Sequence, residues 1–141
     1  MKALFDTNIV LDFLLDRKPF SDHAAFLFTM VERTEIVGYL ASTSITTIHY
    51  LTEKVLNKHH ATSHVKTLLS LFEIAPVNRG VLESAVNSKF VDFEDAVIHE
   101  AALQAGVKYI ISRDKTGFKK SSIPVYLPDM FIKMLISLKG E

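Results

Sequence analysis

Carboxylates in three separate stretches of the sequence could together form one reactive site. Asp6 follows the short apolar run 3–5, and Asp114 follows the stretch 109–113. A third stretch, Asp92-Phe93-Glu94-Asp95, opens a segment with a helical pattern, in which residues three apart point the same way. Aspartates at such positions also cap helices and complement the helix dipole, so each one taken alone has an ordinary structural explanation.

Taken together, these carboxylates predict a site for a hard divalent cation. Two unit charges about 4 Å apart repel by roughly 4 kcal/mol at an effective dielectric of 20, so converging carboxylates need a cation, or nearby Arg and Lys, to offset them. The chain has no cysteine, and its six histidines do not gather at metal-binding spacing. Ligands that are all oxygen favour Mg²⁺ or Mn²⁺ over zinc. Such an ion can polarise a phosphodiester and lower the pKa of the water that attacks it.

The elements that must position these carboxylates alternate between strand and helix. Because the alternation shows no hairpin signal, it predicts βαβ units and a mainly parallel sheet. In open α/β sheets ligands bind beyond the carboxyl ends of the strands, which is where Asp6 and Asp114 fall. Strands are predicted at 2–5, 35–41, 72–75, 107–112 and 123–126, and helices at 8–16, 22–32, 45–56, 61–71, 81–88, 94–105 and 128–138.

Two local details of these elements are also predicted. The hydroxyl residues Ser42, Thr43 and Ser44 are expected to cap the helix at 45–56. In the helix at 22–32, Ala25, Phe26, Leu27 and Phe28 are expected to face inward.

Composition indicates a single domain spanning residues 1–141, with enough apolar material for one core. Lys and Arg number 16 and so do Asp and Glu, giving zero net charge. This balance excludes a charged disordered tail, and it means that any nucleic-acid contact must come from local patches. No apolar run reaches membrane-spanning length, and a charge at the sixth residue comes too early for a signal peptide. A cytoplasmic protein with no membrane partner is therefore expected.

Three motifs in this order resemble the PIN-domain family. They are Asp6-Thr7-Asn8 after the first strand, Asp92-Phe93-Glu94-Asp95-Ala96 at the start of a helix, and Ser112-Arg113-Asp114-Lys115 with Phe118. The family consists of small metal-dependent ribonucleases, best known as the toxins of bacterial VapBC-type toxin–antitoxin pairs. The resemblance extends from Lys2 to about Phe131. It implies a PIN-like three-layer α/β/α sandwich with a mainly parallel central sheet of about five strands.

The resemblance also implies roles for individual residues. Asp6, Asp95 and Asp114 would be catalytic and hold Mg²⁺ or Mn²⁺, with Asp92 as an additional or substitute ligand. Thr7 and Asn8 would support the first aspartate, through a hydroxyl that contacts a ligand water or orients Asp6. One departure concerns Thr47, which occupies the position where many members carry a glutamate. A threonine supplies no carboxylate, so either Asp92 completes the ligand set or metal binding is weaker.

A basic group beside Asp114 could contact RNA. Its members are Arg113, Lys115, Lys119 and Lys120, although a solvated loop would have the same composition. Phe118 within this group is expected to be a core anchor rather than a base-stacking platform. An antitoxin protein and a second copy of the chain, forming a homodimer, are further expected partners.

Several functions remain compatible with these residues. The leading one is a metal-dependent endoribonuclease, and the alternative is a degenerate PIN domain that binds RNA or protein without cleavage, as the Thr47 departure allows. A structure-specific DNA nuclease would share the same metal chemistry. A phosphoacceptor receiver domain is excluded, because the stretch 72–75 ends at Pro76 with no aspartate following.

Overall fold

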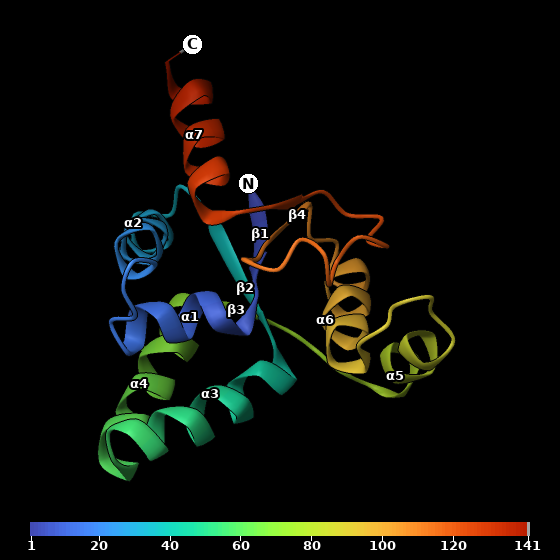
Figure 1. The fold of residues 1–141 in the computed structure, drawn as a ribbon, viewed down its shortest axis with the longest axis horizontal. Coiled ribbons are helices and arrows are strands. Elements are labelled where there is room, and N and C mark those ends of the chain that lie inside the picture. The colour runs from blue at the N-terminus through green and yellow to red at the C-terminus, as the bar shows by residue number, and fades with distance from the viewer. Residues whose placement is uncertain (141) are drawn as a thin grey trace.

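Five short parallel strands form the centre of the fold, and helices cover both of their faces (Figure 1). The computed structural model describes residues 1–140. The sheet order is β3-β2-β1-β4-β5, and all four pairings are parallel, which confirms the predicted three-layer fold. The strands are β1 (Lys2–Phe5), β2 (Val37–Ala41), β3 (Glu73–Ala75), β4 (Tyr109–Ile111) and β5 (Val125–Tyr126); the helices are α1 (Thr7–Leu14), α2 (Ser21–Glu32), α3 (Ser42–Val55), α4 (Lys58–Leu71), α5 (Arg79–Val86), α6 (Phe93–Gln104) and α7 (Pro128–Lys139).

Two hydrophobic cores lie on opposite faces of the sheet, because successive strand residues point to opposite sides. In β1, Ala3 and Phe5 enter the core shared with α1, α2, α3, α4 and α7. Leu4 between them enters the second core, which α5 and α6 cover. Figure 1 shows α5 and α6 on the opposite side of the strands from the other helices. The sheet is thus buried on both faces, and only its two ends can present side chains to a ligand.

Two details of the predicted helices are wrong. Helix α3 begins at Ser42, three residues earlier than expected, and its N-cap is Ala41 with no side-chain cap. The serine hydroxyls bond elsewhere instead: Ser42 accepts from the backbone N–H of Val77, and Ser44 accepts from Thr7. In α2, Phe26 is 38% exposed rather than inward, because the buried face runs through Ala24, Leu27, Phe28 and Val31.

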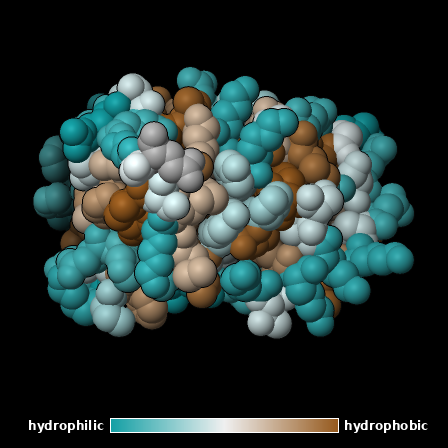
Figure 2. All heavy atoms as spheres, turned by 90° about the horizontal axis from the view of Figure 1, so that it is seen from above, coloured by the Kyte–Doolittle hydropathy of each residue, from teal (hydrophilic) through white to brown (hydrophobic). Residues whose placement is uncertain are grey.

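The surface seen from above in Figure 2 carries hydrophilic side chains around its rim and apolar groups in separate patches. Within residues 1–140, no helix is both long enough and apolar enough to cross a membrane. The prediction that Phe118 is a core residue is confirmed, since it is 2% exposed in the core beneath α6.

Candidate functional site

Asp6 stands where β1 ends and α1 begins. Its extended backbone makes it the N-cap of α1, and its Oδ1 accepts a hydrogen bond of 2.8 Å from the backbone N–H of Thr7. Its own N–H donates to the carbonyl of Ile111 at 2.9 Å, which continues the pairing of β1 with β4. The capping explanation for this aspartate is therefore correct, and the same geometry holds its carboxylate at the carboxyl edge of the sheet.

Ser112 links Asp6 to Asp114. Its Oγ donates to Asp6 Oδ2 at 2.8 Å and accepts from the Asp114 backbone N–H at 2.9 Å. Ser112 is fully buried directly after β4, so this bridge fixes the ends of two neighbouring strands against each other. The sequence motif contains this serine. Its position as a bridge between Asp6 and Asp114 becomes apparent only when β1 and β4 lie side by side.

The first turn of α6 brings the third carboxylate. Asp92 is the N-cap of this helix, and its Oδ2 accepts from the Asp95 backbone N–H at 3.0 Å. Asp92 is exposed, whereas Asp95 is half-buried and faces the other carboxylates. Capping therefore uses Oδ2 of Asp92, and the side chain of Asp95 is left to point into the site.

The three aspartates Asp6, Asp95 and Asp114 line one cavity of about 180 Å³ at the carboxyl ends of the strands. Glu94 lines the same cavity. A wider hollow of about 480 Å³ continues from Asp95 and Asp114 toward Asp92. Residues from three distant stretches of the chain thus line one cavity.

Gly117 allows two of these carboxylates to approach each other. A Cβ atom added there would lie 2.5 Å from Asp114 Oδ2 and 2.8 Å from Asp95 Oδ2. The Gly117 backbone N–H donates to Asp114 Oδ1 at 2.9 Å, which turns the other oxygen of Asp114 toward Asp95. Any side chain at this position would occupy the space between the two oxygens.

The electrostatics of the cavity reflect burial and mutual repulsion. Burial, followed by the negative charges of Asp6, Asp92, Asp114 and Glu94, raises the pKa of Asp95 to about 7. Burial also raises the pKa of Asp6, although hydrogen bonds from Ser112 and Thr7 oppose this effect. A cation placed among these oxygens would reverse both effects, because it favours the ionised carboxylates.

The donor set suits a hard divalent cation. Within residues 1–140, no three His, Asp or Glu side chains are close enough together to enclose a metal ion as they stand. The Oδ2 atoms of Asp95 and Asp114 nevertheless both border the space that a glycine at position 117 leaves open. Asp6 lines the same cavity, with its carboxylate held by Thr7 and Ser112. Oxygen ligands alone match Mg²⁺ or Mn²⁺.

The supporting residues around Asp6 act differently from the expectation. The Thr7 hydroxyl donates to Ser44 Oγ at 2.8 Å, so Thr7 orients Asp6 through its backbone N–H rather than its side chain. Asn8 lines the cavity and accepts from Arg17 at 3.2 Å. Thr47 also lines the cavity, with its hydroxyl 3.4 Å from the Thr43 carbonyl. Thr47, at the position where the resemblance leads one to expect a glutamate, therefore lines the same cavity as the three aspartates.

The four basic residues beside Asp114 lie in three different places. Lys119 and Lys120 line the wider hollow together with the carboxylates, while Lys115 lines a neighbouring depression. Arg113 turns the other way: its Nε and Nη2 donate to Asp12 at 2.7 and 3.1 Å. Asp12 is 1% exposed, which explains why a planar, two-pronged partner is held against it. The only signal for Asp12 in the sequence is one acidic residue among apolar neighbours.

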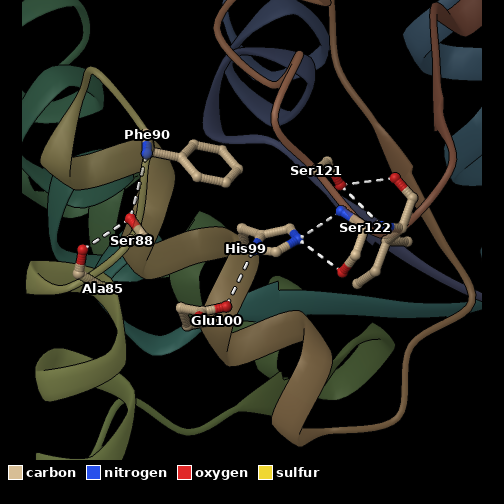
Figure 3. Close-up of polar contacts among 8 residues, drawn as sticks. Ala85, Ser88, Phe90, His99, Glu100, Ser121 and Ser122 are labelled. Carbon is tan, nitrogen blue, oxygen red and sulfur yellow. Dashed lines mark hydrogen bonds and ion pairs between the residues drawn. The ribbon is translucent and has the colours of Figure 1, made fainter.

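His99 connects α6 to the turn that carries Gly117 and the two lysines. As Figure 3 shows, the His99 ring lies between Phe90 and Ser122. Its Nε2 accepts from the Ser122 backbone N–H at 3.1 Å, and its Nδ1 is 3.0 Å from Glu100 Oε2. Burial lowers the pKa of His99, which favours the neutral ring that can accept this bond. The helix bearing Asp95 and the turn following Asp114 are thereby held in one arrangement.

Comparisons with known proteins agree with this fold. The family model that describes the PIN domain matches residues 2–116 of this chain. Ribonuclease VapC1 of Aquifex aeolicus is 26% identical over 122 residues, covering 83% of this chain and 84% of that protein. The DNA-bound VapBC structure from Salmonella typhimurium superposes with a TM-score of 0.69 at 18% identity, covering 91% of this chain and 98% of that chain. A toxin–antitoxin complex from Klebsiella pneumoniae gives a TM-score of 0.67 at 22% identity, covering 89% and 97%. The chain therefore belongs to the PIN domain family.

Proposed function

We propose that this protein is a divalent-metal-dependent endoribonuclease that hydrolyses RNA phosphodiesters. The observation that carries the proposal is the convergence of Asp6, Asp95 and Asp114 in one cavity at the carboxyl edge of the sheet. The name of its Aquifex aeolicus relative, a ribonuclease, supports RNA as the substrate. Lys119 and Lys120, on the wall of the adjoining hollow, would contact the phosphate backbone.

In this mechanism some residues of the chain hold the cation, and others keep the carboxylates that bind it in place. Asp6, Asp95 and Asp114 would hold Mg²⁺ or Mn²⁺, with Asp92 at the rim as a further oxygen donor. When bound, the cation supplies activation of water and polarisation of the phosphodiester. Ser112 keeps the Asp6 carboxylate oriented, and the Gly117 turn holds Asp114. The phosphate would lie between the carboxylates and the two lysines.

Removal of divalent metal should abolish RNA cleavage, and re-addition of Mg²⁺ or Mn²⁺ should restore it. Because the pKa of Asp95 is about 7, protons compete with the cation. The apparent metal affinity should therefore weaken as the pH falls from about 8 to about 6. Cleavage of single-stranded RNA with and without chelator, and calorimetric Mn²⁺ titrations at several pH values, measure both effects. Absence of metal binding at millimolar Mn²⁺, together with no cleavage, would favour the non-cleaving alternative, and cleavage of DNA alone would overturn the choice of substrate.

Replacing Gly117 with alanine should weaken Mn²⁺ binding by about 10- to 100-fold, the range typical of changes to groups that orient metal ligands. The added methyl group would lie 2.5 Å from Asp114 Oδ2 and force that carboxylate away from Asp95. Calorimetry measures the affinity, and Gly80→Ala is the matched control. At Gly80 the nearest atom to an added Cβ is 3.5 Å away, so Mn²⁺ affinity should not change. Equal affinities for both variants would contradict the proposed placement of the metal.

The assembly and location follow the same proposal. The VapBC and toxin–antitoxin complexes among the structural relatives support an antitoxin protein as the partner and a role as the toxin of such a pair. A homodimer acting in the cytoplasm is part of the proposal as well. Co-expression with the product of an adjacent short reading frame, followed by size-exclusion chromatography with light scattering, measures both the complex and the number of copies.

A further inference from the structure

A further cavity is lined by Arg113, the residue before Asp114, and the proposed reaction does not use it. Its volume is about 470 Å³, within the usual range for small-ligand sites, and its lining is mostly apolar. It is formed where the loop before α2 meets the start of α7, with Phe20 and Arg113 in its wall. Pro19 and Pro128 add further rigid apolar surface, while His23 and Asp129 supply its polar groups.

The wall of this cavity contains a flat stacking surface that is fixed in place. The Arg113 guanidinium carbon lies 3.9 Å from the centre of the Phe20 ring. Two N–H groups of Arg113 are bound by the buried Asp12 carboxylate, so the guanidinium plane is held in this orientation. Phe20 remains 40% exposed although it is a large apolar side chain. Arg113 thus holds the Phe20 ring from one side, and the exposed part of the ring is an aromatic surface of the kind on which unpaired RNA bases stack.

The cavity and the carboxylate site are connected through one short segment of the chain. Three consecutive residues serve both places: Ser112 bonds the Asp6 carboxylate, Arg113 lines this cavity, and Asp114 lines the metal cavity. One short segment of the chain therefore contributes to both places. His23 and Asp129 offer hydrogen-bonding partners for the edge of a planar heterocycle.

We infer that this cavity, the Phe20–Arg113 cavity, binds one unpaired base of a single-stranded RNA. The inference rests on the proposed ribonuclease function and adds to it a binding subsite that stacks one unpaired base. Duplex RNA would be a poor substrate, because its bases are stacked on each other and cannot enter the cavity.

Fluorescence binding with a non-cleaving protein tests the subsite. The probe is a 12-nucleotide oligoadenylate with 2-aminopurine at one position at a time, bound to the Asp6→Asn protein in Mg²⁺. Quenching should be strongest at one position. Adding Phe20→Ala should relieve that quenching and weaken binding by about 5- to 150-fold, the equivalent of losing one base–aromatic stack.

Two companion variants separate stacking from other effects. Phe20→Tyr keeps an aromatic ring and should retain both affinity and quenching. Phe26→Ala removes a phenylalanine of similar exposure, 38%, from α2 outside the cavity and should change neither. Circular dichroism checks that every variant is folded.

The outcomes distinguish the subsite from the ribonuclease function. If RNA is cleaved in Mg²⁺ but Phe20→Ala binds and quenches like its parent, the subsite is wrong and the proposed function stands. Loss of affinity in Phe26→Ala as large as in Phe20→Ala would also overturn the subsite. If the wild-type protein neither binds nor cleaves RNA, both inferences fail.

Discussion

The Asp6→Asn variant should lose RNA cleavage by at least about a hundredfold while its thermal stability stays the same or rises. Asparagine keeps an oxygen that can accept from the Thr7 N–H, so the cap of α1 is retained. It removes a negative charge that burial and the neighbouring Asp114 and Glu94 already disfavour, as the raised pKa of Asp6 indicates. Cleavage of single-stranded RNA in Mg²⁺ and thermal unfolding measure the two effects.

The control for this variant is Asp22→Asn, which makes the same change in net charge at a site where the carboxylate is 89% exposed. It should cleave RNA like the wild type. If Asp6→Asn retained full activity, the assignment of the carboxylate cavity would be wrong. If it lost activity only because it unfolded, the melting curve would reveal this, and Asp95→Asn would then test the cavity independently.

Most of the fold follows from local patterns in the sequence. The alternation of short apolar runs with helical segments suffices to predict a parallel sheet, because parallel strands need a crossover connection. Boundaries such as the start of α3 are less predictable, since the hydroxyl groups of Ser42 and Ser44 could cap a helix or bond distant groups equally well. The outcome depends on Val77 and Thr7, which are far from them in the sequence.

The candidate site is predictable to the extent that it depends on strand ends. Asp6 and Asp114 could be placed because the carboxyl ends of parallel strands share one edge of the sheet. The roles of Ser112 and Gly117 could not, because each depends on distances between segments that only the folded chain brings together. Arg113 shows the same limit: beside three lysines it resembles a phosphate contact, and only the burial of Asp12 reveals its other partner.

Replacing Arg113 with alanine should destabilise the protein by about 3–5 kcal/mol, the usual cost of leaving a buried carboxylate without its partner. Asp12 is 1% exposed, and its remaining cationic neighbour, Arg17, is 3.7 Å away and therefore outside good hydrogen-bonding distance. For a chain of this length the melting temperature should fall by roughly 10 °C or more. Chemical denaturation measures the free energy of unfolding directly.

Two further variants show whether this loss comes from the unpaired charge. Arg79→Ala breaks an ion pair of 3.3 Å with Glu83 in which both side chains are exposed, and it should cost less than about 1 kcal/mol. The double variant Asp12→Leu/Arg113→Met replaces the buried pair with apolar groups and should recover most of the lost stability, because no buried charge remains. A loss below about 1 kcal/mol for Arg113→Ala would mean that water or Arg17 satisfies Asp12. The Arg113–Asp12 pair joins the segment before Asp114 to α1. If the pair contributes so little, the positions of Asp6 and Asp114 relative to each other would depend chiefly on the Ser112 bridge.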